Sequence, residues 1–197
     1  LAVVEVFADA SGSDAGREWI ELRVTASEHV DLNGLDIVVS KSETGSMRRA
    51  QVTAPECLAV GPGELPVIGS SSDRAANGGV AVTAVVPELS LYDGAELAID
   101  LHWADDVIDV ARVPAAAPGA SWSVAGPAVE GVANDDVQAF CVAASGGVFD
   151  GQGTPGCPNV CGVGCLDSSG CVRELRPAGV GELLLSEVYA NPPSDDG

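Results

Sequence analysis

The chain carries short apolar runs separated by turn-forming residues about every ten positions, and this pattern predicts strands rather than helices. The runs hold mainly valine, alanine, isoleucine and leucine, and no segment shows a convincing helical period. We expect eight to nine strands with tight connections between them. The expected strands cover residues 2–8, 18–24, 36–40, 64–69, 80–86, 96–101, 107–113, 120–124 and 140–142.

The second run, residues 18–24, shows the alternation most clearly. Every second side chain points to the same face of a strand, so its three aliphatic residues would face a core. Glu21 and Arg23 would then face water. By the same count Trp19 falls on the outer face, where it would cover a sheet edge or mark a bulge.

Glycine and proline punctuate the whole chain, with 24 and 12 copies. An Asn-Gly pair at residues 33–34 and an Asp-Gly pair at 93–94 are typical of tight turns. The polar stretch 41–49 is expected to be a surface loop. Many short strands with frequent turns predict an all-β, immunoglobulin-like β-sandwich.

The end of the chain repeats its beginning: residues 183–197, LLLSEVYANPPSDDG, resemble residues 1–16, LAVVEVFADASGSDAG. This self-similarity predicts a tandem array, with 182–197 as the opening strand of a second repeat. Such a strand would pair with a neighbouring copy or an adjacent repeat, with main-chain hydrogen bonds providing affinity. Alternatively, it would lie on an edge of its own sandwich. The expected assembly strand consists of Leu183, Leu184, Leu185, Val188 and Tyr189.

The charge is strongly one-sided, because 29 acids face nine bases and only one of these is a lysine, Lys41. Such a surface repels phosphate backbones and anionic lipid, so we expect neither nucleic-acid binding nor docking on anionic lipid. No stretch of eighteen apolar residues exists, so we expect no membrane insertion. The acidity is better explained by solubility or a salty medium than by binding of a divalent cation. Asp105–Asp106 and Asp135–Asp136 could bind calcium, but such pairs are more often solvated turns. No other cofactor is expected.

Several segments, taken together and in order, resemble the lamin-tail domains over residues 1–159. The most specific are EWIEL at 18–22 and GTPGCPN at 153–159. The others are VDLNGLDI at 30–37, CLAVGPGELPVIG at 57–69, LSLYDGAELAIDL at 89–101, VIDVARV at 107–113 and GASWSV at 119–124. The resemblance implies an immunoglobulin-like sandwich of the type found in bacterial secreted and surface proteins, often in several copies or beside hydrolases. The basic surface that some nuclear members use for DNA is missing, so that activity is not carried over.

Six cysteines, an even number with four clustered, indicate an oxidising compartment. The apolar neighbours of Cys57 and Cys141 favour a buried disulfide between them over two buried thiols. The other four, Cys157, Cys161, Cys165 and Cys171, are more consistent with two disulfides than with a zinc site, because no histidine or CxxC pair is near. Among three possible pairings we favour Cys157–Cys165 with Cys161–Cys171. Residues 160–181 would then form a disulfide-rich linker.

Catalytic residues are not evident. The two histidines, His29 and His102, fall in expected turns without a neighbouring nucleophile. Carboxylates are so abundant that no pair is informative, although a cleft holding an acid of perturbed pKa would favour a hydrolase.

We therefore expect a non-enzymatic structural or adhesive repeat of a fibre, coat or surface adhesin, located outside the cell or on its surface. The alternative is a targeting or binding module attached to a secreted hydrolase.

Overall fold

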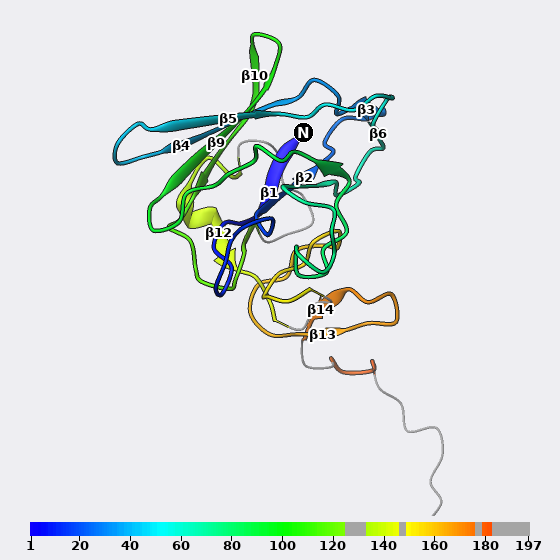
Figure 1. Cartoon of the computed structure of the whole chain (residues 1–197). Helices are drawn as coiled ribbons and strands as arrows, with labels where there is room; N and C mark the ends of the chain where they lie inside the picture. The colour runs from blue at the N-terminus through cyan, green and yellow to red at the C-terminus, as the bar shows by residue number, and fades with distance from the viewer. Residues whose placement is uncertain (125–132, 146–148, 176–178, 183–197) are drawn as a thin grey trace, which may run out of the picture.

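A computed structural model describes residues 1–124, 133–145, 149–175 and 179–182, and this part of the chain is nearly all β (Figure 1). Its only helical element is the 3₁₀ turn η1, Val137–Ala139. The strands are β1 (Ala2–Phe7), β2 (Trp19–Arg23), β3 (Val30–Asp31), β4 (Asp36–Lys41), β5 (Met47–Gln51), β6 (Ala59–Val60), β7 (Val67–Gly69), β8 (Ala84–Val85), β9 (Leu97–Trp103), β10 (Asp106–Val113), β11 (Trp122–Val124), β12 (Phe140–Val142), β13 (Gly164–Leu166) and β14 (Val172–Glu174).

Two sheets form the body of the molecule. The larger has the order β12-β11-β1-β2-β7-β8, and the smaller has the order β10-β9-β4-β5. All pairs are antiparallel except β7 with β8. Two small two-stranded sheets, β3-β6 and β13-β14, lie at opposite ends of the molecule (Figure 1). The first strand, β1, therefore lies inside the larger sheet, between β11 and β2.

One hydrophobic core joins the two large sheets. Ile20 and Leu22 of β2 are fully buried in it together with Ile37 of β4 and Leu101 of β9. The expected inward orientation of the aliphatic residues in 18–24 is thus confirmed. The arrangement agrees with the all-β sandwich that the apolar pattern predicts, in which side chains from two sheets fill a shared interior.

The strands number fourteen in the described residues, more than the eight to nine expected. Residues 41–49 were expected to be a loop, but β5 begins at Met47 and pairs with β4. Four of the five β5 residues are exposed, because the strand lies at a sheet edge. The sequence of this strand, MRRAQ, therefore lacks the alternation of apolar and polar residues that would have predicted a strand. The other additions, β3, β6, β13 and β14, are only two or three residues long.

The expected assembly strand, Leu183, Leu184, Leu185, Val188 and Tyr189, lies outside the described residues.

Truncating a core side chain should cost far more than truncating a surface one. Leu101→Ala should lower the free energy of unfolding by about 2–5 kcal/mol, because it leaves a cavity between the sheets. Met47→Ala is the control, since Met47 is 72% exposed on β5, and it should change the free energy by no more than about 0.5 kcal/mol. Urea unfolding measures both, and equal losses would contradict the shared core.

Candidate functional site

A row of polar side chains crosses the outer face of the larger sheet. The strand register places Glu5 opposite Glu21 on one side and opposite Ser123 on the other, and Ser123 opposite Cys141. We call these four residues the polar row. Glu5, Glu21 and Ser123 have no exposed surface, although they face away from the core. A further layer of chain must therefore cover this face.

The covering layer is the segment that contains the GTPGCPN sequence. Thr154 donates its backbone N–H to Glu5 Oε1 at 2.8 Å and its hydroxyl to Glu5 Oε2 at 2.7 Å. Ser121 donates a third hydrogen bond to Glu5 Oε1. A Cβ on Gly153 would lie 2.8 Å from Glu5 Oε1, so only glycine allows this close approach. We call residues 153–174 the cap.

Glu21, on the neighbouring strand, accepts a hydrogen bond from the Gly156 backbone N–H through Oε2. Its Oε1 is buried without a partner among the described residues. Burial raises the pKa of Glu21 well above its usual value, and the Glu5 carboxylate beside it adds to this. Burial also raises the pKa of Glu5, against the opposing effect of its donors. The sequence pattern placed Glu21 in water, and this was wrong because the cap covers its face of the sheet.

An aromatic cluster continues the same outer face beside the polar row. Phe7 and Trp19 stack with their ring centroids 5.7 Å apart, and Phe149 packs edge-on against both. The outward orientation predicted for Trp19 is therefore confirmed, but Trp19 is fully buried beneath residue 149. The segment leading into the cap thus makes apolar contacts before it makes polar ones.

Two asparagines hold β1 where its regular pairing fails. The β1–β2 register shifts between Val3 and Glu5, as at a β-bulge. Asn159 of the cap donates Nδ2 to the Val4 carbonyl oxygen at 2.6 Å. Asn134 donates Nδ2 to the Val3 carbonyl oxygen at 2.9 Å.

The backbone N–H of Val3 has a side-chain partner as well: it donates to Asp109 Oδ2 at 2.9 Å. Side chains thus replace the hydrogen bonds that a regular ladder would have supplied.

The cysteines pair differently from the sequence-based expectation. Disulfides join Cys141 to Cys161 and Cys157 to Cys171, replacing both the Cys57–Cys141 bridge and the pairings Cys157–Cys165 and Cys161–Cys171. Strand alternation explains Cys141, since Phe140 faces the core and Cys141 faces the cap. The two disulfides indicate an oxidising environment.

Cys57 and Cys165 are exposed, free thiols. The apolar neighbours of Cys57 suggested burial, and Leu58 and Val60 do pack in the core, but Cys57 itself is exposed. The six cysteines therefore do not all form disulfides in this structure, and these two remain available on the surface.

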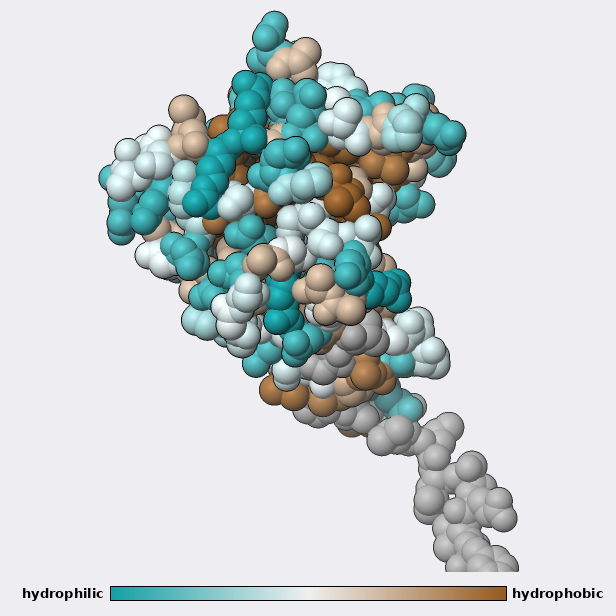
Figure 2. Space-filling model, viewed as in Figure 1, coloured by the Kyte–Doolittle hydropathy of each residue, from teal (hydrophilic) through white to brown (hydrophobic). Residues whose placement is uncertain are grey.

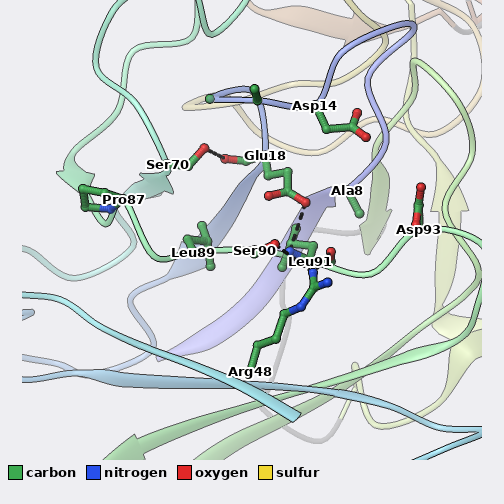
Figure 3. Close-up of a pocket in the computed structure, with 12 residues that line it drawn as sticks. Ala8, Asp14, Glu18, Arg48, Ser70, Pro87, Leu89, Ser90, Leu91 and Asp93 are labelled. Carbon is green, nitrogen blue, oxygen red and sulfur yellow. Dashed lines mark hydrogen bonds between the residues drawn. The ribbon is translucent and has the colours of Figure 1, made fainter. Parts of the chain in front are cut away.

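An open recess of about 430 Å³ lies where β5 meets the loops before β2 and before β9 (Figure 3). Glu18 points into it and accepts a hydrogen bond from the Leu91 backbone N–H at 3.0 Å. Burial raises the pKa of Glu18 to about 7, and the charges of Asp14 and Asp93 add to this. The recess thus holds an acid with a raised pKa, and such an acid in a cleft is typical of a hydrolase.

The basic side chain of the recess is already engaged. Arg48 donates to the Leu91 carbonyl oxygen at 2.6 Å and to the Ser90 hydroxyl at 2.8 Å. Its guanidinium lies 3.9 Å from the centre of the Tyr92 ring. Arg48 thus covers one face of Tyr92, and none of the residues that line the recess is aromatic, so the recess lining offers no ring on which a sugar could stack.

The other residues considered for chemistry lie apart from one another. His29 is exposed in the loop before β3, and His102 is half-buried in β9, not in the turn. Asp105–Asp106 is at the β9–β10 turn, and Asp136 caps η1 by accepting the Gln138 N–H. Within the described ranges, no three histidine, cysteine or acidic residues are arranged to hold a metal ion.

The comparisons identify no relative: no family model, no curated protein and no solved structure matches the chain. The resemblance to the lamin-tail domains therefore stays a prediction. No helix in the described part of the chain is long and apolar enough to cross a membrane.

The two buried glutamates should respond differently to removal of their charge. Glu5→Gln replaces one acceptor oxygen by an NH₂ group facing donors, so it should lower the free energy of unfolding by about 3 kcal/mol. Glu21→Gln keeps an oxygen for the Gly156 N–H and carries no charge, so it should cost less than about 1 kcal/mol at pH 7. Denaturant unfolding followed by near-ultraviolet circular dichroism measures both.

The pH dependence of the free energy of unfolding tests separately whether Glu21 is protonated in the folded state. Because the folded-state pKa of Glu21 is raised, its contribution to stability is complete below the usual value of 4.5 and is lost as the pH rises toward the folded-state pKa. The native chain should therefore lose stability more steeply than Glu21→Gln as the pH rises above 5. Identical slopes would show that Glu21 is ionised in the folded state.

Proposed function

We propose that this chain is a non-enzymatic, extracellular structural or adhesive repeat module of the lamin-tail type. Consecutive copies are joined through a first strand that recurs at residues 183–197. The observation that carries the proposal is the recurrence of four consecutive residues. Glu5, Val6 and Ala8 recur unchanged as Glu187, Val188 and Ala190, and the aromatic Phe7 recurs as Tyr189.

The roles of these residues in β1 support the proposal. Glu5 accepts the hydrogen bonds of the cap, Val6 is buried in the core, and Phe7 stacks on Trp19. A segment that keeps the acid, the aliphatic residue and the aromatic residue in this order has the side chains that a first strand needs. Surface segments seldom preserve such a pattern, because nothing there requires it.

The position of β1 also favours one form of assembly. All six β1 residues are buried, and the strand lies between β11 and β2. A second strand can enter this place only by displacing the first. The tail is therefore better suited to open a further sandwich than to attach to the edge of its own. The two disulfides agree with a location outside the cell.

Removing or recharging the tail should abolish self-association without unfolding the body. We expect the full chain to form concentration-dependent assemblies by exchange of first strands, measured by light scattering after size exclusion. A chain ending at residue 182 should remain a folded monomer. Glu187→Lys should do the same, because it places a cation where Glu5 needs a carboxylate.

Asp195→Lys is the matched control, since it changes the charge equally but lies beyond the repeated strand residues. It should assemble like the native chain. Assemblies of unchanged size in the shortened chain, or equal loss in both lysine variants, would refute the proposed role of the tail.

A second candidate function, acid–base hydrolysis in the recess, is favoured by the raised pKa of Glu18 near Asp14 and Asp93. Against it stand the occupied Glu18 oxygen and the covered face of Tyr92. Neither serine of the recess donates to a base: Ser70 donates to the Glu18 backbone oxygen, and Ser90 accepts from Arg48.

The structural proposal predicts that the full chain releases no nitrophenol from a panel of nitrophenyl glycosides and esters between pH 5 and pH 8. Release that is lost in Glu18→Gln and retained in Glu88→Gln would favour the hydrolase instead, because Glu88 is an exposed acid in the loop before β9 and does not line the recess. Absorbance at 405 nm is sufficient to follow the reaction. Inactivity in all three proteins supports the structural role.

A further inference from the structure

The two free thiols lie at opposite ends of the molecule. Cys57 is on the segment before β6, at the end that also holds the N-terminus, and Cys165 is in β13, at the end where the described chain finishes (Figure 1). We call these the N-terminal end and the C-terminal end. Both thiols are exposed, although the other four cysteines are paired in disulfides. In an oxidising environment, exposed thiols without a partner in their own chain are candidates for bonds between chains.

The C-terminal end exposes aliphatic side chains near its thiol. Val172 of β14 faces inward and packs against Ala144 and Val160. On the opposite face of the β13–β14 hairpin, Cys165 lies across from Arg173, which is ion-paired with Asp167. The next pair along the same face is Val163 and Leu175, which are 74% and 55% exposed. Figure 2 shows hydrophobic side chains at this end of the molecule. Exposed aliphatic side chains grouped on one face are typical of a surface that another protein covers.

Chain length favours the next copy as the protein that covers it. This step rests on the proposed function, in which a second copy begins at Leu183. Leu183 follows Leu175 by eight positions, and eight extended residues span at most about 28 Å. The start of the following copy therefore lies within about 28 Å of the hairpin of the preceding one.

The N-terminal end carries the second free thiol on a surface that is partly apolar and partly acidic. Around Cys57, Pro55 and Ala59 are exposed and Leu58 is half-buried against the core. Glu56 is exposed beside Cys57, and Asp31 is hydrogen-bonded to the Cys57 thiol. This acidic side is opposite in charge to the exposed Arg173 beside Cys165.

We propose that the C-terminal end of each copy packs against the N-terminal end of the next, and that Cys165 forms a disulfide with Cys57 of that next copy. The oxidant is a small disulfide such as glutathione disulfide. The Cys165 thiolate attacks it and releases one thiolate; the Cys57 thiolate then attacks the Cys165 sulfur and releases the second. Two cysteine thiols are oxidised, one small disulfide is reduced to two thiols, and two protons pass between them.

Single cysteine variants of the full chain test the proposal. In a glutathione redox buffer at high protein concentration, the native chain should form a ladder of covalent oligomers on a non-reducing gel. Cys57→Ser alone and Cys165→Ser alone should remain mostly monomeric. A mixture of the two variants should form a heterodimer and nothing longer, because each variant keeps one of the two thiols.

Peptide mass mapping identifies the bond. The expected result is a cross-link between the Cys57 and Cys165 peptides, with Cys141–Cys161 and Cys157–Cys171 intact as a check on folding. Symmetric Cys57–Cys57 or Cys165–Cys165 links, bonds from Cys165 to a cysteine of its own chain, or two alkylatable thiols per chain would each overturn the inference.

The double variant, Cys57→Ser with Cys165→Ser, separates this inference from the proposed function. Light scattering should show that it still associates through the tail, although no covalent ladder forms. If the double variant and the native chain assemble equally and no Cys57–Cys165 peptide is found, the disulfide is refuted and the repeat function stands. If neither protein assembles, the repeat function fails too.

Discussion

The fold depends on a carboxyl group, that of Glu5, buried on the face of the larger sheet that points away from the sandwich core. Glu5 lies outside the sandwich core, and it is sealed from water only because the cap donates hydrogen bonds to both of its oxygens. An ionised carboxyl group without such donors would be expensive to bury. The cap and the sandwich therefore need each other: without the cap Glu5 returns to water, and without Glu5 the Thr154 donors lose their acceptor.

Three kinds of contact act on the same stretch of chain. Phe149 completes the aromatic cluster, Thr154 and Gly156 donate hydrogen bonds to the two glutamates, and Asn159 donates to the bulged part of β1. The disulfide from Cys161 to Cys141 then fixes the end of this stretch to the sheet. Because β1 is central to the larger sheet, contacts made near the end of the chain stabilise its beginning. These contacts between distant parts of the sequence help to explain how a chain with few aromatic residues adopts a single fold.

Sequence patterns predicted the parts of the fold that follow from local alternation. The strand at residues 18–24, its inward aliphatic residues and the outward Trp19 were all recovered. The burial of Glu21 was not, because alternation assigns a face but cannot tell which face will be covered by a distant segment. The GTPGCPN and EWIEL sequences were the only available signal, and their contact became visible only in three dimensions.

The disulfide pairings were predicted wrongly for a related reason. Apolar neighbours suggested that Cys57 and Cys141 were interior, yet in a strand the neighbours of a residue point the opposite way. Glu18 illustrates the remaining gap: burial raises its pKa and the charge of Asp93 adds to this, while the Leu91 N–H opposes it, and no local pattern connects these distant residues to Glu18.

The disulfides also set how the molecule would bear tension applied at its two termini. A covalent bridge between Cys157 and Cys171 carries load directly, and the load then runs from Cys157 through three residues to Cys161. The second bridge passes that load onward from Cys161 to β12 at the margin of the large sheet. Residues 162–170, which include β13, therefore bear no load, whereas β14 lies beyond Cys171 and can be pulled away from β13 before the large sheet is sheared.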